Sequence, residues 1–244
     1  MVILANYHPN YTEHNMGDAL LAVPFIQYLA RTNEVYLEMQ NKEVFQLLPP
    51  DPNIKTIRQM PAGGVDFCFR LSINDVILRW PDRNLNPTDG LFRMFGLPGV
   101  APPAILSPQV YNDDMDYDYV IAPWVYEGNE REWPVDGWTS IIPRLGKVAV
   151  IGAKENHPFM LGPHYYSGKS LSLVAHLMKR AKRIVTMESG PSRLVQALGL
   201  SSKHYMLAMP WFPRVWIAGP ESKLLVADLP SLSPEAVFDF ITAT

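Results

Sequence analysis

Short apolar strands alternate with helical segments along the first part of this chain, and this alternation constrains the fold more than any other feature. Extended apolar segments are expected at residues 1–7, 34–39, 54–59 and 65–71. Apolar side chains recur at helical spacing in residues 18–31, and residues 42–48 form a shorter helical segment. A helix between two strands returns the chain to the start of the next strand, so the strands pair in parallel. The sequence therefore predicts an α/β fold with a parallel sheet covered by helices.

The second part of the chain repeats this pattern. Strands are expected at residues 117–122, 147–151, 183–187, 204–207 and 224–226. Helices are expected at residues 138–145, 170–180, 191–198 and 234–242. Ser233 and Pro234 suit the cap and the first turn of the last helix. Two successive parallel α/β units are therefore predicted.

A proline-rich stretch separates the two series. The 23 prolines are about twice the usual share of ~5%, and they concentrate in residues 48–52, in residues 210–220 and, between the two series, in residues 97–108. Proline fixes one backbone angle and donates no hydrogen bond, so this stretch is expected to be an extended crossing between domains. Residues 75–96 before it are expected to be irregular or helical, with Phe92, Phe95 and Leu97 packing inward. The predicted domains are residues 1–112 and 113–244. Ligands bind beyond the carboxyl ends of parallel strands, so the site is expected in a cleft where two such sheets face each other.

Composition excludes several classes of protein. Hydrophobic residues make up 48% of the chain and charged residues 18%, which excludes disorder as the main state. No apolar run reaches the ~20 residues of a spanning helix and no signal peptide opens the chain, so we expect a cytoplasmic protein, at most peripheral to a membrane. Cys68 is alone and is expected to be buried. A net charge of -3 does not favour DNA as a partner, without excluding it.

The first candidate site is the segment after the first strand. Gly17 and Asp18 open the first helix, and His8 and His14 lie in the preceding loop. The Asp18 carboxylate suits either a helix cap or a chemical role. The two histidines are candidates for binding a substrate.

The second candidate site is the turn at residues 188–193, where a strand leads into a helix. Free amides at a helix start can hold a diphosphate. The turn also supplies hydroxyl groups and a cation, and two lysines upstream could reach the same anion. The candidate donor-binding residues are Glu188, Ser189, Gly190, Pro191, Ser192, Arg193, Lys154 and Lys169. No glycine-rich fingerprint or phosphate-binding lysine motif is present, so an ordinary strand-to-helix turn is the alternative interpretation.

Two further patterns have structural alternatives. Trp124, Trp133 and Trp138, with Arg131 and Glu132 among them, could stack on a base or a sugar, although Trp138 better fits a core position. Four aspartates in residues 113–118 have oxygen ligands suited to a divalent cation, although a solvated linker is the favoured interpretation. The histidines lack metal-ligand spacing. We therefore predict no metal site.

Taken together, these segments resemble glycosyltransferase family 9, the heptosyltransferases. Gly17-Asp18 followed by Leu20-Leu21 and Pro24 is similar to the opening of that family. A second match resembles its donor-binding segment and consists of Gly168-Lys169-Ser170-Leu171, Glu188-Ser189-Gly190-Pro191 and Arg193-Leu194. The family usually has Asp in place of Glu188 and His in place of Arg193.

This resemblance implies a GT-B fold, in which two Rossmann-like domains face each other across a cleft. It implies an acceptor-binding N-terminal domain, a C-terminal domain that binds a nucleotide sugar without a metal or other cofactor, and Asp18 as general base. We expect an inverting glycosyltransferase that moves a sugar from a nucleoside-diphosphate sugar to a hydroxyl of a glycan or lipid-linked saccharide. The alternatives are transfer to a hydroxymethylated base in DNA, hydrolysis or epimerisation of a nucleotide sugar, and a non-catalytic nucleotide-sugar binding or scaffold protein.

Overall fold

The computed structural model describes residues 1–7, 16–38, 42–56, 59, 62–71, 86–98, 100–111, 116–125, 131–152, 164–211 and 219–243. The chain divides into two compact units, Met1–Pro108 and Gln109–Thr244. The division falls at the end of the proline-rich stretch, slightly before the boundary expected at residue 112. Every strand pair described in either unit is parallel, as the alternation of strands and helices predicted.

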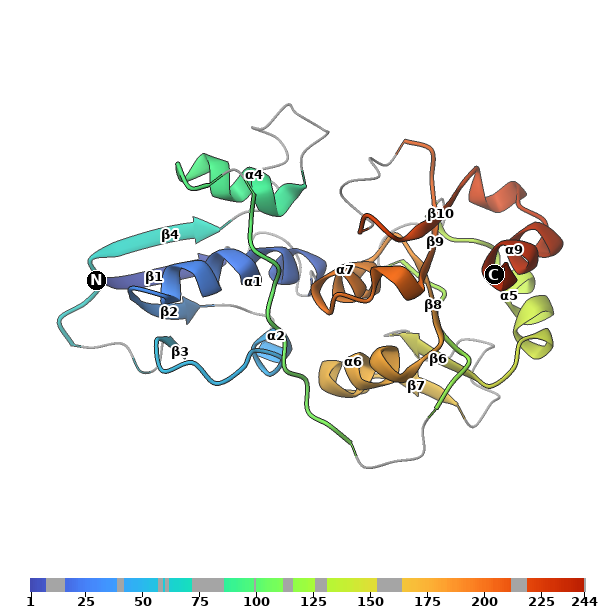
Figure 1. Ribbon diagram of the computed structural model, residues 1–244, viewed down its shortest axis with the longest axis horizontal. Coiled ribbons are helices and arrows are strands. Elements are labelled where there is room, and N and C mark those ends of the chain that lie inside the picture. Colours follow the sequence, from blue (N-terminus) through green and yellow to red (C-terminus); the bar gives the residue numbers. More distant parts are fainter. Residues whose placement is uncertain are drawn as a thin grey trace. The chain divides into compact units, whose positions relative to one another are not determined.

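The first unit contains a four-stranded sheet in the order β3-β2-β1-β4. Its strands are β1 (Val2–Tyr7), β2 (Glu34–Glu38), β3 (Ile54–Thr56) and β4 (Phe67–Leu71) (Figure 1). Its helices are α1 (Met16–Ala30), α2 (Lys42–Phe45) and α4 (Pro87–Met94). Helix α4 lies within residues 75–96, for which the sequence left open either an irregular or a helical structure. Its start is determined locally, because the Asn86 side chain accepts a hydrogen bond from the Thr88 amide and Pro87 opens the first turn.

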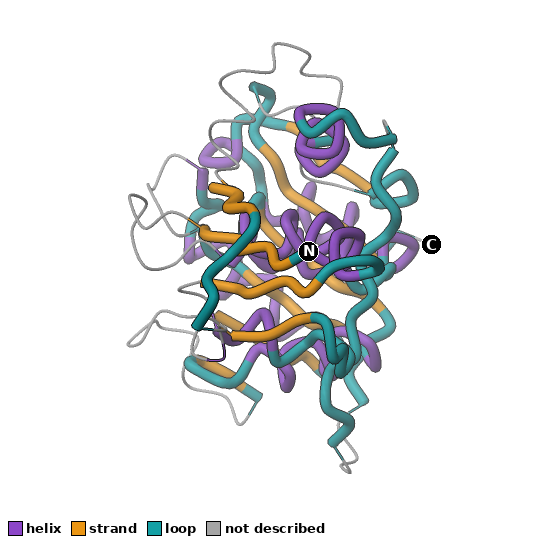
Figure 2. Tube along the Cα trace, turned by 90° about the vertical axis from the view of Figure 1, so that its left-hand side faces the viewer, coloured by secondary structure: helices purple, strands orange, loops and turns teal. Residues whose placement is uncertain are grey.

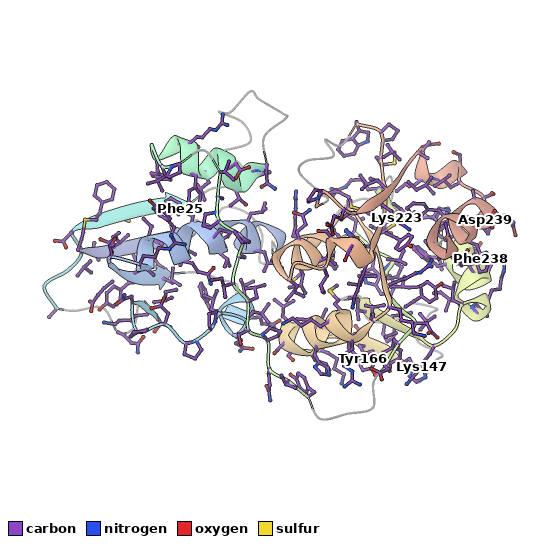
Figure 3. All side chains as sticks on the ribbon, in the orientation of Figure 1. Phe25, Lys147, Tyr166, Lys223, Phe238 and Asp239 are labelled. Carbon is purple, nitrogen blue, oxygen red and sulfur yellow. The ribbon has the colours of Figure 1, made fainter. Side chains whose placement is uncertain are left out.

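Helices α1 and α4 cover one face of the first sheet. Strand residues Ile3 and Val35 share a core with side chains from both helices. Phe25 of α1, labelled in Figure 3, meets the Phe92 ring of α4 edge to face with the ring centroids 5.7 Å apart. Phe95 and Leu97 pack against the same core, as expected.

The expectation that Cys68 is buried is wrong. Cys68 is exposed on β4, and within the described part of the sheet this strand pairs with β1 alone. An apolar run predicts a strand, but it does not predict whether that strand lies at the centre or at the edge of its sheet.

The second unit contains a six-stranded sheet in the order β10-β9-β8-β5-β6-β7. Its strands are β5 (Tyr119–Ala122), β6 (Val148–Gly152), β7 (Tyr165–Ser167), β8 (Arg183–Met187), β9 (His204–Ala208) and β10 (Lys223–Val226). Strands are drawn in orange in Figure 2, where they lie alongside one another within their sheets. Strand β7 was not anticipated, because its three residues are all half-buried and show no alternation.

Helices lie on both faces of this second sheet. They are α5 (Val135–Ile141), α6 (Leu171–Arg180), α7 (Gly190–Ala197) and α9 (Pro234–Thr242), with short 3-10 turns at Ile142–Arg144, Ser201–Lys203 and Leu229–Ser231. Ile121 and Val185 share a core with residues of α5 and α9. Their strand neighbours Val120 and Ile184 point to the other face, where α6 and α7 lie (Figure 1).

Three tryptophans of the second unit, Trp124, Trp133 and Trp138, are core residues. Trp133 and Trp138 are buried and meet edge to face at 4.8 Å. Trp124 is also buried. Helix α5 begins at Val135, earlier than expected, with Pro134 at its N-cap. The core interpretation of Trp138 is confirmed.

The described residues of the proline-rich stretch form neither helix nor strand, as expected, and hydrogen bonds hold the chain on both sides of the boundary between the units. In the first unit, the Gln27 side chain donates to the Ile105 carbonyl at 2.7 Å and accepts from the Ile105 amide at 2.9 Å. In the second unit, the Gln109 amide donates to the Ser172 hydroxyl at 2.7 Å. Pro108 lies between these two attachments.

Within the described parts of the chain, no helix combines the length and the apolar character needed to span a membrane.

A buried polar network joins three neighbouring strand segments of the second sheet. His204 on β9 is fully buried, with Nε2 2.8 Å from the Thr186 hydroxyl of β8 and Nδ1 3.0 Å from the Ser222 hydroxyl next to β10. Burial lowers the pKa of His204 to about 4. The imidazole is therefore neutral in the folded protein near neutral pH.

We predict that acid destabilises the fold through His204. In the unfolded chain the His204 pKa returns to about 6.5, so below that pH the unfolded state binds a proton that the folded state does not. The free energy of unfolding should fall by about 2 kcal/mol between about pH 7.5 and pH 5 from this group, and the loss should be complete once the pH passes below the folded pKa. Urea unfolding of the wild type and of His204→Gln at both pH values measures this. An equal pH dependence in the two proteins would contradict it.

Candidate functional site

The order of strands in the second sheet marks one edge as the candidate ligand site. From β5 the chain proceeds outward to β6 and β7, whereas from β8 it proceeds in the opposite direction to β9 and β10. The helices that follow these two neighbouring strands, α5 and α7, lie on opposite faces (Figure 1). Such a reversal opens a crevice beyond the carboxyl ends of the two strands. In this chain that position belongs to residues 123–125 after β5 and residues 188–190 after β8.

The turn after β8 has the local structure that the sequence predicted. Strand β8 ends at Met187, Ser189 is the cap with extended backbone, and α7 begins at Gly190 with Pro191 in its first turn. Gly199 follows the helix with a positive φ of 69°, a conformation that glycine adopts without strain. Pro191 has no amide hydrogen and the Ser192 amide donates to the Ser189 carbonyl, so the amides of Ser189 and Gly190 are the candidates for binding an anion at this helix start.

The Ser192 hydroxyl does not take the position expected of it. Ser192 is fully buried, and both its hydroxyl and its amide donate to the Ser189 carbonyl, at 2.7 and 3.1 Å. These bonds tighten the first turn of α7 and direct the hydroxyl away from solvent. Arg193, one residue further along, is half-buried. Of the turn's polar side chains, Ser192 therefore has a structural role.

An ion pair joins the two loops at this edge of the sheet. The Arg131 guanidinium donates to Glu188 Oε2 at 2.9 Å, and the two side chains are 25% and 13% exposed. Arg131 precedes α5, and Glu188 directly follows β8. Sequence reasoning named both residues in separate motifs and missed the pair. The signal that could have found it is the adjacency of β5 and β8, which depends on the order of the strands.

The loop after β5 is held by two further interactions. Glu132 accepts a hydrogen bond from the Val125 amide at 3.0 Å. The Trp124 indole packs against Gly152 at the end of β6, where a Cβ atom would overlap the ring. Glycine is therefore required at this position, because the backbone of β6 and the indole approach each other closely.

The first sheet also changes direction between β1 and β4, but the helices that follow these strands, α1 and α4, share one face of the sheet. The chain proceeds from β1 to β2 and β3 on one side, and β4 pairs with the other side of β1. Helix α1 follows β1 and begins at Met16, earlier than expected, so Gly17 and Asp18 lie in its first turn and Asp18 is not the cap. Gly17 is buried. The Asp18 side chain, His8, His14 and Lys154 lie outside the part of the chain that the structure describes.

The remaining predicted residues lie elsewhere. Lys169 is exposed after β7, two strands away from β5. Asp116 pairs with Arg180 at 2.6 Å and Asp118 with Lys182 at 2.7 Å, near the amino end of β5.

The hydrogen bond from Lys182 and a further one from the Lys147 amide lower the pKa of the Asp118 carboxyl. Asp113 and Asp114 lie outside the described residues. In the described ranges, no three acidic, histidine or cysteine side chains cluster as they would around a metal ion.

Comparison with known proteins gave matches to solved structures only. No family model and no curated protein matches the chain. The iron-containing dodecameric glycosyltransferase TibC from enterotoxigenic E. coli H10407 aligns with 17% identity and a TM-score of 0.68, over 91% of this chain and 61% of TibC. This chain thus spans less than two thirds of the length of TibC. A second TibC structure is in complex with ADP-D-beta-D-heptose.

Two further solved structures are similar. E. coli heptosyltransferase WaaC with ADP aligns with 13% identity and a TM-score of 0.66 over 99% of both chains. A glycosyl transferase family 9 protein from Veillonella parvula DSM 2008 aligns with 14% identity and a TM-score of 0.62, over 93% of this chain and 85% of that one. At these identities the likeness shows the fold. It confirms the α/β fold class of the heptosyltransferases, with two parallel sheets, that the sequence predicted.

Proposed function

We propose that this protein is an inverting glycosyltransferase that uses a nucleoside-diphosphate sugar. The observation that carries the proposal is the turn at residues 188–193, which lies at the reversal between β5 and β8 and opens a helix. That arrangement suits a diphosphate. The fold shared with ADP-binding heptosyltransferase structures supports the same choice. The acceptor is a hydroxyl of a glycan or lipid-linked saccharide.

Each unit has its own part in this proposal. The C-terminal residues 113–244 bind the donor through the amides of Ser189 and Gly190, with Arg193 and Lys154 as cations, and Lys169, which follows β7, has no part in this contact. The N-terminal residues 1–112 bind the acceptor near Gly17, with His8 and His14 in the loop that follows β1. Asp18 lies in the first turn of the helix after β1. This position is beyond the carboxyl end of β1, where ligands bind in parallel sheets.

The reaction is a displacement at the anomeric carbon. The acceptor oxygen forms a bond to that carbon, the bond from the carbon to the diphosphate oxygen breaks, and the electron pair leaves with the diphosphate. Asp18 accepts the proton of the acceptor hydroxyl, a contribution commonly worth about 100 to 10,000-fold in rate. The amides at the start of α7 and the Arg193 guanidinium stabilise the negative charge that develops on the leaving group.

We predict that Asp18→Asn abolishes sugar transfer and leaves the affinity for ADP within a few-fold of wild type. Asparagine has nearly the same volume but cannot take up the proton, and the donor is assigned to the other unit. Transfer is measured with ADP-sugars and calorimetry gives the affinity. Asp239→Asn, at an exposed position on α9 (Figure 3), is the matched control. Turnover close to wild type in Asp18→Asn would show that Asp18 is not the base.

We predict that Arg193→Ala weakens the binding of ADP by about 1–3 kcal/mol, the range for hydrogen bonds to charged groups. Binding of adenosine should change much less, because the guanidinium is assigned to the diphosphate. Calorimetry with both ligands measures the difference, and Arg93→Ala at an exposed position of α4 is the control. Equal weakening of both ligands, or of neither, would refute the phosphate assignment.

The proposal includes no metal requirement, so we predict that transfer persists in EDTA. One reason is that cations and amides are assigned to neutralise the diphosphate. A second is that Asp116 and Asp118 are paired with Arg180 and Lys182. The measurement is the initial rate before and after chelation. TibC is described as iron-containing, so iron is tested beside magnesium and manganese. Loss of activity that any of these ions restores would overturn metal independence.

A further inference from the structure

Glu188 places a carboxylate directly before the helix start that is proposed to bind a diphosphate. Its side chain is only 13% exposed, so water screens its charge poorly. A diphosphate approaching the amides of Gly190 would meet this negative charge within a few residues of chain. Like charges at such separations repel each other. The turn is therefore suited to an anion only if the Glu188 charge is compensated.

Arg131 supplies that compensation across the reversal between β5 and β8. Its guanidinium lies 2.9 Å from Glu188 Oε2, and its side chain is 25% exposed. The two residues lie in loops that follow neighbouring strands. The charge that would oppose the diphosphate is thus neutralised from the other side of the crevice.

The position of Arg131 is fixed by the residues that follow it. The next residue, Glu132, accepts a hydrogen bond from the Val125 amide at 3.0 Å. Trp133 is buried and its indole nitrogen donates to the Leu232 carbonyl at 3.0 Å. These two contacts anchor the chain on the C-terminal side of Arg131, so the guanidinium is held before any ligand arrives.

We propose that Arg131 is a positioning residue for the nucleoside diphosphate and acts through Glu188. It neutralises and holds the carboxylate, which makes the start of α7 accept a diphosphate. This inference rests on the proposed function, because it assumes that the diphosphate binds at this turn. It differs from a direct phosphate contact, because its effect depends on the presence of the Glu188 charge.

A double-mutant cycle tests this dependence. Calorimetry compares ADP and adenosine binding to the wild type, Arg131→Met, Glu188→Gln and the double variant. Arg131→Met should weaken ADP about tenfold, the scale of one charge-assisted contact, and should change adenosine less than twofold. Glu188→Gln should bind ADP at least as tightly as wild type. The double variant, in which both charges are gone, should return to within about threefold of wild type.

Matched controls separate this effect from a loss of structure. Arg131→Lys retains the positive charge and should restore most of the ADP affinity. Arg144 and Glu235 form a second ion pair, at 3.4 Å, between the end of α5 and the start of α9. Arg144→Met with Glu235→Gln should leave ADP binding unchanged. Unfolding midpoints of all variants show whether each is folded.

Three outcomes would overturn the proposal in different ways. A double variant as weak as Arg131→Met would mean that Arg131 contacts the ligand itself. An unchanged ADP affinity in Arg131→Met would mean that the pair is structural only. If the wild type binds none of ADP, UDP, GDP and CDP, the proposed function is wrong and this inference fails with it. If the wild type binds one of them but the double-mutant cycle shows no coupling between Arg131 and Glu188, only this inference is wrong.

Discussion

Parallel strand pairing with a reversal of direction is the constraint on which the rest of this structure depends. A parallel strand needs a crossover to its neighbour, and each crossover helix covers one face of the sheet. Where the direction reverses and the two following helices take opposite faces, the strand ends between them are left accessible. Both sheets change direction, at β1 and β4 and at β5 and β8, but only β5 and β8 are followed by helices on opposite faces, because α1 and α4 share one face of the first sheet. The helix start with Asp18 follows β1, and the turn with Glu188 follows β8. Both strands lie where the chain changes direction in its sheet, which is why these two segments are the candidates for chemistry.

The sequence predicted those elements of the fold that have strong local signals. Strand β8 has the expected bounds because its apolar run is compact, and α9 has them because Ser233 caps it and Pro234 opens it. Strand β7 and the exposure of Cys68 were not predicted. Both depend on which neighbours a strand acquires in three dimensions, and a short apolar segment contains no information on that point.

In the candidate site, too, the features with local sequence signals could be predicted, and those that depend on the three-dimensional arrangement could not. The turn at residues 188–193 could be located because its cap, its proline and the glycine beyond the helix are all local. The pairing of Arg131 with Glu188 could not, because 57 positions separate them in sequence and only the adjacency of β5 and β8 brings them together. The inward direction of the Ser192 hydroxyl was missed for a different reason. A buried hydroxyl takes the nearest carbonyl, here that of Ser189, and no sequence pattern distinguishes it from an exposed one.

The docking of the proline-rich stretch has a mechanical consequence. On one side of Pro108, the Ser107 amide donates to the Leu47 carbonyl at 2.6 Å. On the other side, the Gln109 amide is bound to Ser172. Because the proline ring fixes φ of Pro108, few free backbone torsions remain between residues 107 and 109. The backbone on either side of the boundary is therefore held to the body of its own unit up to the residues next to Pro108.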